Sequence, residues 1–241
     1  MSTLDVNGVT FAIEYKDIKH IHLSVYPPDG RAHVSAPLGL SEAQVRLFIL
    51  RKWIWLSEKI RQAKSHSIVA TRQFVSGEEN FWRGQPYRLK VIEDITVMPK
   101  ISVNGDYLEL YAPPRSTRER RMQILNDWYR RQLNETLERV VPKWEERLGV
   151  QSESWDIMRM RARWGSCQVS TRTLLFNLEL AKKPLDCVEY VVVHELAHLL
   201  EKSHNDRFQQ ILQTYLPTWQ EQRRQLNDLP ISEELFGEDE K

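Results

Sequence analysis

The sequence predicts an α+β protein in which a β-rich N-terminal region precedes a mixed C-terminal region. Three observations lead to this class. Turn signals separate short β-prone runs in the first half, helical periodicity begins after Pro113-Pro114, and further strands and helices follow it. The expected parts are therefore residues 1–114, residues 115–228 and an acidic tail of residues 229–241. No internal repeat is apparent.

The N-terminal region is expected to be mostly sheet with one helix. Asn7-Gly8 and the segment 27–30 each separate β-prone runs, which predicts two successive hairpins. Ser41 and Gln44 form a capping box, so an amphipathic helix is expected to begin there. Further turn signals at two positions predict a second β-rich stretch: Arg83-Gly84 and Asn104-Gly105.

The C-terminal region is expected to open with a long helix. Ser116 and Glu119 form its capping box, apolar residues recur at helical spacing until Gly149, and Pro142 is expected to kink or restart the helix. The elements expected next are a strand (155–164), a break at Gly165-Ser166, a strand (173–180), and helices that begin near Pro184, Asn205 and Pro217.

Composition excludes several classes of protein. Because 34 Lys and Arg oppose 33 Asp and Glu, the net charge of +1 provides no overall field that would draw the chain onto nucleic acid or anionic lipid. Two cysteines cannot form a disulfide framework, and no apolar run is long enough to span a membrane. The first residues also lack the features of a signal peptide. We therefore expect a soluble cytoplasmic protein with no membrane partner.

His194, Glu195 and His198 form a His-Glu-x-x-His motif in a segment that is expected to be helical. Residues four apart share one face of a helix, so the two imidazoles can point at a single ion. Glu195 lies beside them and can accept a proton from metal-bound water without being a ligand. This pattern is typical of zinc hydrolases. The alternative is a helix whose two histidines are merely packed or exposed.

His204 is the expected third metal ligand. It follows His198 by six residues, too many for one unbroken helix, so the helix is expected to end near residues 201–202 and the chain to turn back. Alternatively, Glu201, Asp206 or a distant acid supplies the third ligand. The spacing equals that of metzincins, but Glu201 replaces the glycine of their motif, so their fold is not inferred.

Hydrolysis of a peptide bond is the reaction that fits this ligand set best. Three neutral imidazoles leave Zn²⁺ its full charge and one open position for water. Glu195 would deprotonate this water during its attack on a carbonyl and then protonate the leaving amine. Two rivals remain: a zinc hydrolase of non-peptide amides, and a non-catalytic zinc-containing module that binds protein or DNA. A purely structural site would not need Glu195.

These motifs resemble those of the YgjP-like zinc metallopeptidases, relatives of the SprT and Spartan proteases. The resemblance is carried by these segments: Arg163–Cys167, Tyr190–His198, His204–Phe208, Gly77-Glu78 and Arg83–Tyr87. It implies a zincin-like metallopeptidase domain over residues 115–228, zinc on His194, His198 and His204, and catalysis by Glu195. It also implies that Phe208 packs under the site, although Gln209 stands where the family usually has a large aromatic residue.

Arg163 and Trp164 are the candidate substrate-binding residues. Arg159, Arg161 and Arg163 alternate with apolar residues, so three guanidinium groups would line one face of the strand expected at 155–164. In zincin folds an edge strand beside the metal pairs with the substrate backbone, and this segment would supply it. The alternative is a polar face held by salt bridges.

Two further features carry weaker expectations. Between Arg115 and Arg131 six arginines face two acids, with two aromatic residues interleaved, so this helix is a candidate contact for nucleic acid. The alternative, a solvated face of an amphipathic helix, is the commoner case. Cys167 and Cys187 are expected to be buried thiols and not zinc ligands.

Overall fold

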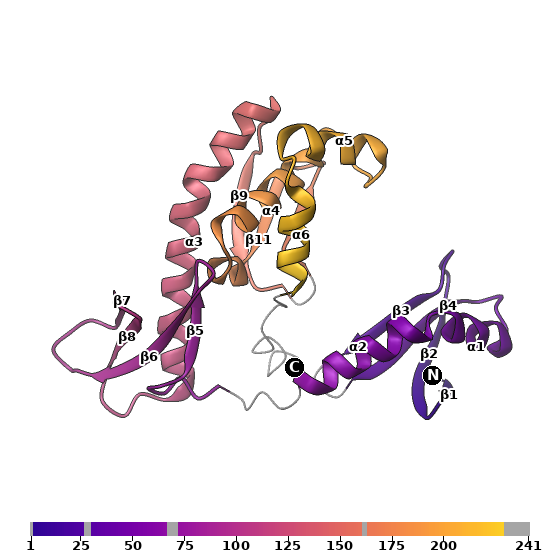
Figure 1. Cartoon of the computed structure of the whole chain (residues 1–241), viewed down its shortest axis with the longest axis horizontal. Helices are drawn as coiled ribbons and strands as arrows, with labels where there is room; N and C mark the ends of the chain where they lie inside the picture. The colour runs from indigo at the N-terminus through magenta and orange to yellow at the C-terminus, as the bar shows by residue number, and fades with distance from the viewer. Residues whose placement is uncertain (1, 27–29, 67–71, 161–162, 229–241) are drawn as a thin grey trace. The chain divides into compact units, whose positions relative to one another are not determined.

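The computed structural model describes residues 2–26, 30–66, 72–160 and 163–228, which form two compact units (Figure 1). One unit comprises the chain up to Arg72, and the other begins at Gln73. The expectations for Arg161 and for the tail of residues 229–241 lie outside the described residues. Within the described ranges, no helix combines the length and the apolar character that crossing a membrane requires.

The first unit is a four-stranded sheet with two helices packed on it. Its elements are β1 (Ser2–Val6), β2 (Val9–Lys16), β3 (His22–Tyr26), β4 (Arg31–Pro37), α1 (Glu42–Arg51) and α2 (Trp53–His66). The strand order is β1-β2-β4-β3, with β2 and β4 parallel and the other pairs antiparallel. The predicted capping box is confirmed at Ser41 and Gln44, but a turn at Lys52 divides the single expected helix into two.

The second unit opens with a sheet of the same topology. Its strands are β5 (Glu79–Trp82), β6 (Gln85–Glu93), β7 (Lys100–Asn104) and β8 (Tyr107–Ala112). They follow the order β5-β6-β8-β7, again with a parallel central pair, and again a helix follows the last strand. The chain thus contains a topological repeat that its sequence conceals, because different residues can supply equivalent turns and apolar alternation.

A polar network connects three strands of this second sheet. Glu109 on β8 is only 8% exposed and accepts hydrogen bonds from Lys90 Nζ on β6 (2.9 Å) and Asn104 Nδ2 on β7 (3.4 Å). The hydroxyl of Tyr111 donates a third bond, at 3.1 Å. The Lys90 hydrogen bond, above all, holds the pKa of Glu109 below its usual value.

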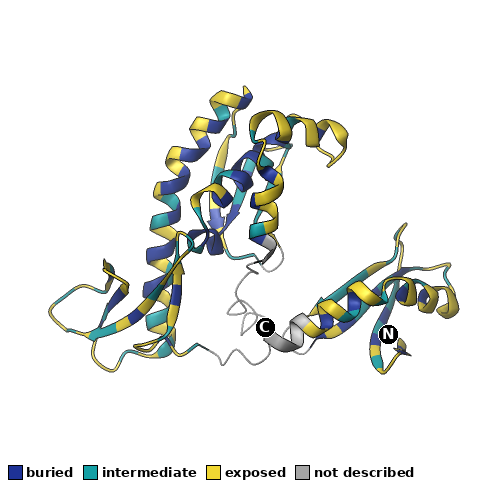
Figure 2. Cartoon of the chain, in the orientation of Figure 1, coloured by how far each residue is buried: buried dark blue, intermediate teal, exposed yellow. Residues whose placement is uncertain are grey.

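Helix α3 (Arg118–Leu148) connects this sheet with the rest of the second unit. It begins one residue later than predicted, because Thr117 and not Ser116 accepts the capping hydrogen bond. The helix was expected to kink or restart at Pro142; it does not restart there but continues, and it ends as predicted at Gly149, whose φ is 66°. Buried residues recur along the length of α3 (Figure 2).

The remaining elements form a three-stranded sheet and three α-helices. They are β9 (Ser154–Met158), β10 (Gly165–Gln168), β11 (Thr173–Asn177), the 3₁₀ helix η1 (Leu178–Lys182), α4 (Leu185–Ala197), α5 (Asp206–Tyr215) and α6 (Trp219–Asp228). The strand order is β10-β11-β9. The strand expected at 155–164 therefore ends at Met158, and Gly165, expected as a break, instead begins a strand.

One hydrophobic core joins the second sheet, α3 and the C-terminal elements. It contains Leu89 and Leu110 from the sheet, Tyr129 from α3 and Val192 from α4, all of them buried. Because α3 packs against both the second sheet and helix α4, a boundary near residue 114 would cut through this core. The observed division between the compact units, after residue 72, therefore differs from the expected one.

Two fragments distinguish these boundaries. A protein that starts at Gln73 should unfold cooperatively, whereas one that starts at Arg115 should not, because it lacks the core side chains of the sheet. Each such buried apolar side chain contributes about 1.5–3 kcal/mol, a large share of a typical domain stability of about 5–15 kcal/mol. Thermal unfolding followed by circular dichroism measures the difference. Equally cooperative unfolding of both fragments would support the boundary near residue 114.

Candidate metal centre

The β5–β6 turn fixes the start of α4, the helix that carries the histidine motif. Gly84 has a φ of +79°, and a Cβ at this residue would lie 2.6 Å from Cγ of Pro184, the residue that precedes α4. The backbone N–H groups of Arg83 and Gly84 donate to the carbonyls of Ala181 (3.2 Å) and Lys182 (3.0 Å). Close backbone approach thus connects the second sheet to the helix of the site.

Helix α4 ends at Ala197, earlier than the end predicted near residues 201–202. His198 is its C-cap and keeps a helical backbone, with φ −65° and ψ −19°, so its side chain still lies about one turn beyond the first histidine. The chain then turns and presents His204 just before Asn205, whose side chain caps α5. The predicted turn back toward the motif is therefore present, and it begins sooner.

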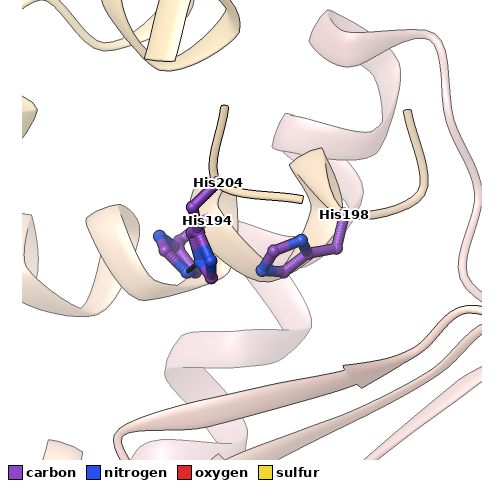
Figure 3. Close-up of side chains that lie close together, drawn as sticks. All are labelled: His194, His198 and His204. Carbon is purple, nitrogen blue, oxygen red and sulfur yellow. Dashed lines mark hydrogen bonds between the residues drawn. The ribbon is translucent and has the colours of Figure 1, made fainter. Parts of the chain in front are cut away.

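The imidazoles of His194, His198 and His204 converge (Figure 3). One ring nitrogen from each lies within 4.8 Å of the others, and Nε2 of His204 is 3.0 Å from Nε2 of His194. Two nitrogens that bind one tetrahedral zinc ion at about 2.0–2.1 Å are about 3.3 Å apart. Nδ1 of His198 lies 3.2 Å from the Glu201 carbonyl oxygen, which leaves Nε2 available as a ligand. The geometry therefore fits a metal ion.

Phe208 packs against all three imidazoles, as the resemblance implied. Its ring centroid lies 4.7 Å from that of His198, 4.8 Å from that of His204 and 5.0 Å from that of His194, and the side chain is 1% exposed. Burial lowers the pKa of His194 to about 3 and also lowers that of His198. These two imidazoles are consequently neutral at pH 7, the form that binds metal.

Glu195 is buried where α4 approaches β10. Its residue is 6% exposed, and a Cβ built on Gly165 would lie 2.7 Å from Oε1 and 2.8 Å from Cγ of this glutamate. Only glycine leaves room for the carboxylate at this position of the strand. Interpreting Gly165 as a break missed this role, although a glycine next to a strand is a known signal of close approach.

Burial raises the pKa of Glu195 to about 8, and the nearby charge of Arg163 acts in the opposite direction. Like the charge of Arg163, a dication held by the three histidines would lower the pKa of Glu195 and favour its carboxylate form. Nδ1 of His194 is buried without a hydrogen-bond partner in the described part of the chain. The site therefore combines the neutral imidazoles of His194 and His198 with one poorly solvated carboxyl group, that of Glu195.

The segment before β10 is held by Asn177, a residue that the sequence did not indicate. Asn177 is fully buried, and its Nδ2 donates to the carbonyl oxygens of Met160 (2.8 Å) and Arg163 (2.7 Å). Its backbone N–H donates to the carbonyl oxygen of Trp164 (2.9 Å). Arg163 is exposed and Trp164 is half-buried, and both line a cavity of about 600 Å³ that includes the metal site.

Strand β10 presents an open edge to this cavity. Among the described strands, it pairs only with β11. Because Trp164 O accepts from β11 and hydrogen-bonding direction alternates along an antiparallel strand, the backbone groups of Gly165 and Cys167 face away from β11. The edge strand at the site is therefore β10, and not the expected segment 155–164.

The cysteines do not belong to the histidine group. Cys187 is buried, and its Sγ donates to Oε1 of Gln225 at 3.2 Å. Burial raises the pKa of Cys187 to about 12 and that of Cys167, which is half-buried in the cavity wall, to about 11. Both side chains therefore remain thiols at neutral pH.

Several arginines between Arg115 and Arg131 contact their own chain. Arg118 lies over the Phe74 ring at 5.6 Å, Arg121 bonds Ser116 Oγ at 3.0 Å, and Arg130 donates to the Ile157 carbonyl. These contacts support an intramolecular role for part of the cluster, and the expected contact with nucleic acid gains no support from them.

A family model described as "YgjP-like, metallopeptidase domain" matches residues 19–229 of this chain. The chain belongs to the YgjP-like metallopeptidase family. The match extends from just before β3 to just after α6, so the family region of this YgjP-like chain is longer than the expected domain of residues 115–228. The convergent histidines lie inside the match.

Other comparisons add little to this assignment. The metallopeptidase zymogen of Methanocaldococcus jannaschii jannalysin is 23% identical, and the match covers 39% of this YgjP-like chain and 97% of that chain with a TM-score of 0.36. The metallopeptidase zymogen of Pyrococcus abyssi abylysin is 19% identical, with coverages of 39% and 94% and a TM-score of 0.36. Among the proteins with curated functions, none is significantly similar in sequence.

Replacing Gly165 tests the close contact with Glu195. Gly165→Ala should destabilise the second unit by about 1–3 kcal/mol, the usual cost of overpacking, because the added methyl group meets the buried carboxylate. Urea unfolding measures this change. Ser166→Ala is the matched control, since its side chain lies on the opposite face of the same strand. If the two variants are equally stable, the contact at Gly165 is not restrictive.

Proposed function

We propose that this YgjP-like chain is a zinc-dependent peptidase in which His194, His198 and His204 hold the metal and Glu195 is the general base and acid. The observation that carries the proposal is the burial of Glu195 against Gly165, directly beside three convergent imidazoles. A carboxylate in this position can serve a reaction, whereas a structural metal site has no use for it.

Zinc is the metal that these donors suit. Three imidazoles that are close enough to share one ion form a common ligand set of catalytic zinc sites, in which the fourth position stays open. A bound zinc ion would supply a Lewis acid that activates water and polarises the scissile carbonyl. The backbone oxygen of Glu201 would orient His198 by accepting its Nδ1–H.

Glu195 would carry the proton. Its carboxylate would accept a proton from the attacking water and then transfer it to the nitrogen of the leaving amine. Because the side chain is 6% exposed, little bulk water competes for this proton, and the wall formed by Gly165 limits its movement. Both conditions favour a direct transfer between water, carboxylate and amine.

The open edge of β10 supports a protein or peptide substrate. The backbone groups of Gly165 and Cys167 that face away from β11, and that have no partner in the described part of the chain, would pair with an extended substrate backbone and lay it across the cavity. A motif helix beside such an edge strand is the arrangement of zincins, which supports a zincin-like assignment for residues 115–228, the part of the second unit that follows its first sheet. Arg163 and Trp164 line the same cavity and would contact the substrate.

The rival functions predict different behaviour. A zinc hydrolase of non-peptide amides would use the same histidines and Glu195 but would have no need for the free edge of β10. A non-catalytic binding module would have no need for Glu195 at all. Family membership and the buried carboxylate together favour the peptidase.

Glu195→Gln should keep zinc and lose activity. The amide fills the same space but cannot accept the proton, so the rate of cleavage of a broad protein substrate should fall by about 10²–10⁴-fold. Zinc content by elemental mass spectrometry and the cleavage rate are measured together, with Glu221→Gln, an exposed acid on α6, as the control. A Glu195→Gln variant that cleaves as fast as the parent would refute the assignment.

His204→Ala tests the third ligand. It should weaken zinc binding by more than the roughly 10–100-fold typical of changes outside the ligand shell. Glu201→Gln should leave zinc affinity nearly unchanged, because the backbone carbonyl that faces His198 remains. Competition with a chromogenic chelator measures both affinities. If the loss is greater for Glu201→Gln, the third ligand is an acid and His204 is a turn residue.

A further inference from the structure

The cavity around the metal site has a cationic wall. Arg163, Lys202 and Arg223 line it, and among the described residues that do so Glu195 is the only acid. The three cations come from separate parts of the chain: the segment before β10, the turn after α4, and helix α6, which lies against α4 (Figure 1). Positive charge therefore surrounds the cavity from several sides.

None of these cations is neutralised by an ion pair within the described part of the chain. All three residues are exposed, which leaves their charged groups accessible to a ligand. By contrast, the neighbouring Arg224 has a carboxylate partner, Glu221, at 3.9 Å, and does not line the cavity. Glu195 is buried against Gly165 and forms no ion pair with these three cations in the described part of the chain.

We propose that the cavity selects peptides that carry acidic side chains close to the bond to be cleaved. This inference rests on the proposed function, because it specifies which substrates that site accepts. An extended peptide paired with the edge of β10 passes Arg163 at the start of the strand and lies between β10 and α6. Charges around a cavity with low-dielectric walls reinforce one another, and a metal dication adds to the same field.

Measuring the affinity for peptides tests the charge preference without requiring cleavage. The probe is a set of fluorescent peptides of equal length with blocked ends. The residues on both sides of the central peptide bond are all Glu, all Gln or all Lys. Zinc-loaded Glu195→Gln protein is titrated with each peptide, and fluorescence anisotropy gives the affinity. The Glu peptide should bind most tightly and the Lys peptide most weakly, and the difference should shrink at high salt.

Two adjacent arginines on α6 provide a matched pair of variants. In the Glu195→Gln background, Arg223→Gln should weaken binding of the Glu peptide by about three- to tenfold and leave the Gln peptide unchanged, and Arg223→Lys should restore the affinity. Arg224→Gln should change neither. Peptides with a free C-terminus and no acidic side chain test whether a terminal carboxylate alone is sufficient.

The outcomes are distinct. The proposed selection for acidic side chains is overturned by any of four results. These are equal binding of the Glu and Lys peptides, no binding of either, equal effects of the Arg223 and Arg224 variants, and a preference only for free C-termini. Failure of the parent protein to cleave any of the peptides instead refutes the proposed function, because the affinity order is measured without cleavage.

Discussion

The contact between Gly165 on β10 and Glu195 on α4 is the constraint on which the candidate site depends. A strand without a side chain at this point lets the helix approach until the carboxylate is enclosed beside the imidazoles. Other contacts position both β10 and α4. Asn177 fixes the segment that leads into β10, and Gly84 packs against Pro184 at the start of α4. The position of one carboxyl group is thus set by two packing contacts and by the hydrogen bonds of Asn177.

The supporting structure is larger than the elements that carry the three convergent histidines. Helix α3 buries one set of side chains against the second sheet and another against α4 and η1, so these parts share a single core. The first unit, by comparison, has a core of its own that includes Phe11, Val34 and Ile49. Because the family match begins at residue 19, it includes residues of both units and extends well beyond the histidine motif.

Features set by local chemistry could be predicted from the sequence, and features set by distant partners could not. The cap at Ser41, the helix beginning after Asn205 and the turn back toward His204 depend on neighbouring residues, and they appear as expected. The end of β9 at Met158 and the role of Gly165 depend on strand pairing and on a helix thirty residues away in sequence. Single-sequence periodicity contains no information about either partner.

Two sheets with one topology in the same chain raise a problem of strand choice during folding. A strand of the first sheet has the right length and direction to replace one of the second, and such exchange is a familiar route to misassembly in repetitive proteins. The Glu109 network opposes it. In a sheet with an exchanged strand, Glu109 would lose the Lys90 or Asn104 side chain that bonds it, and the loss of a hydrogen bond to this buried carboxylate disfavours the exchange. A polar cluster that contains none of the three convergent histidines thereby favours the native pairing of these strands.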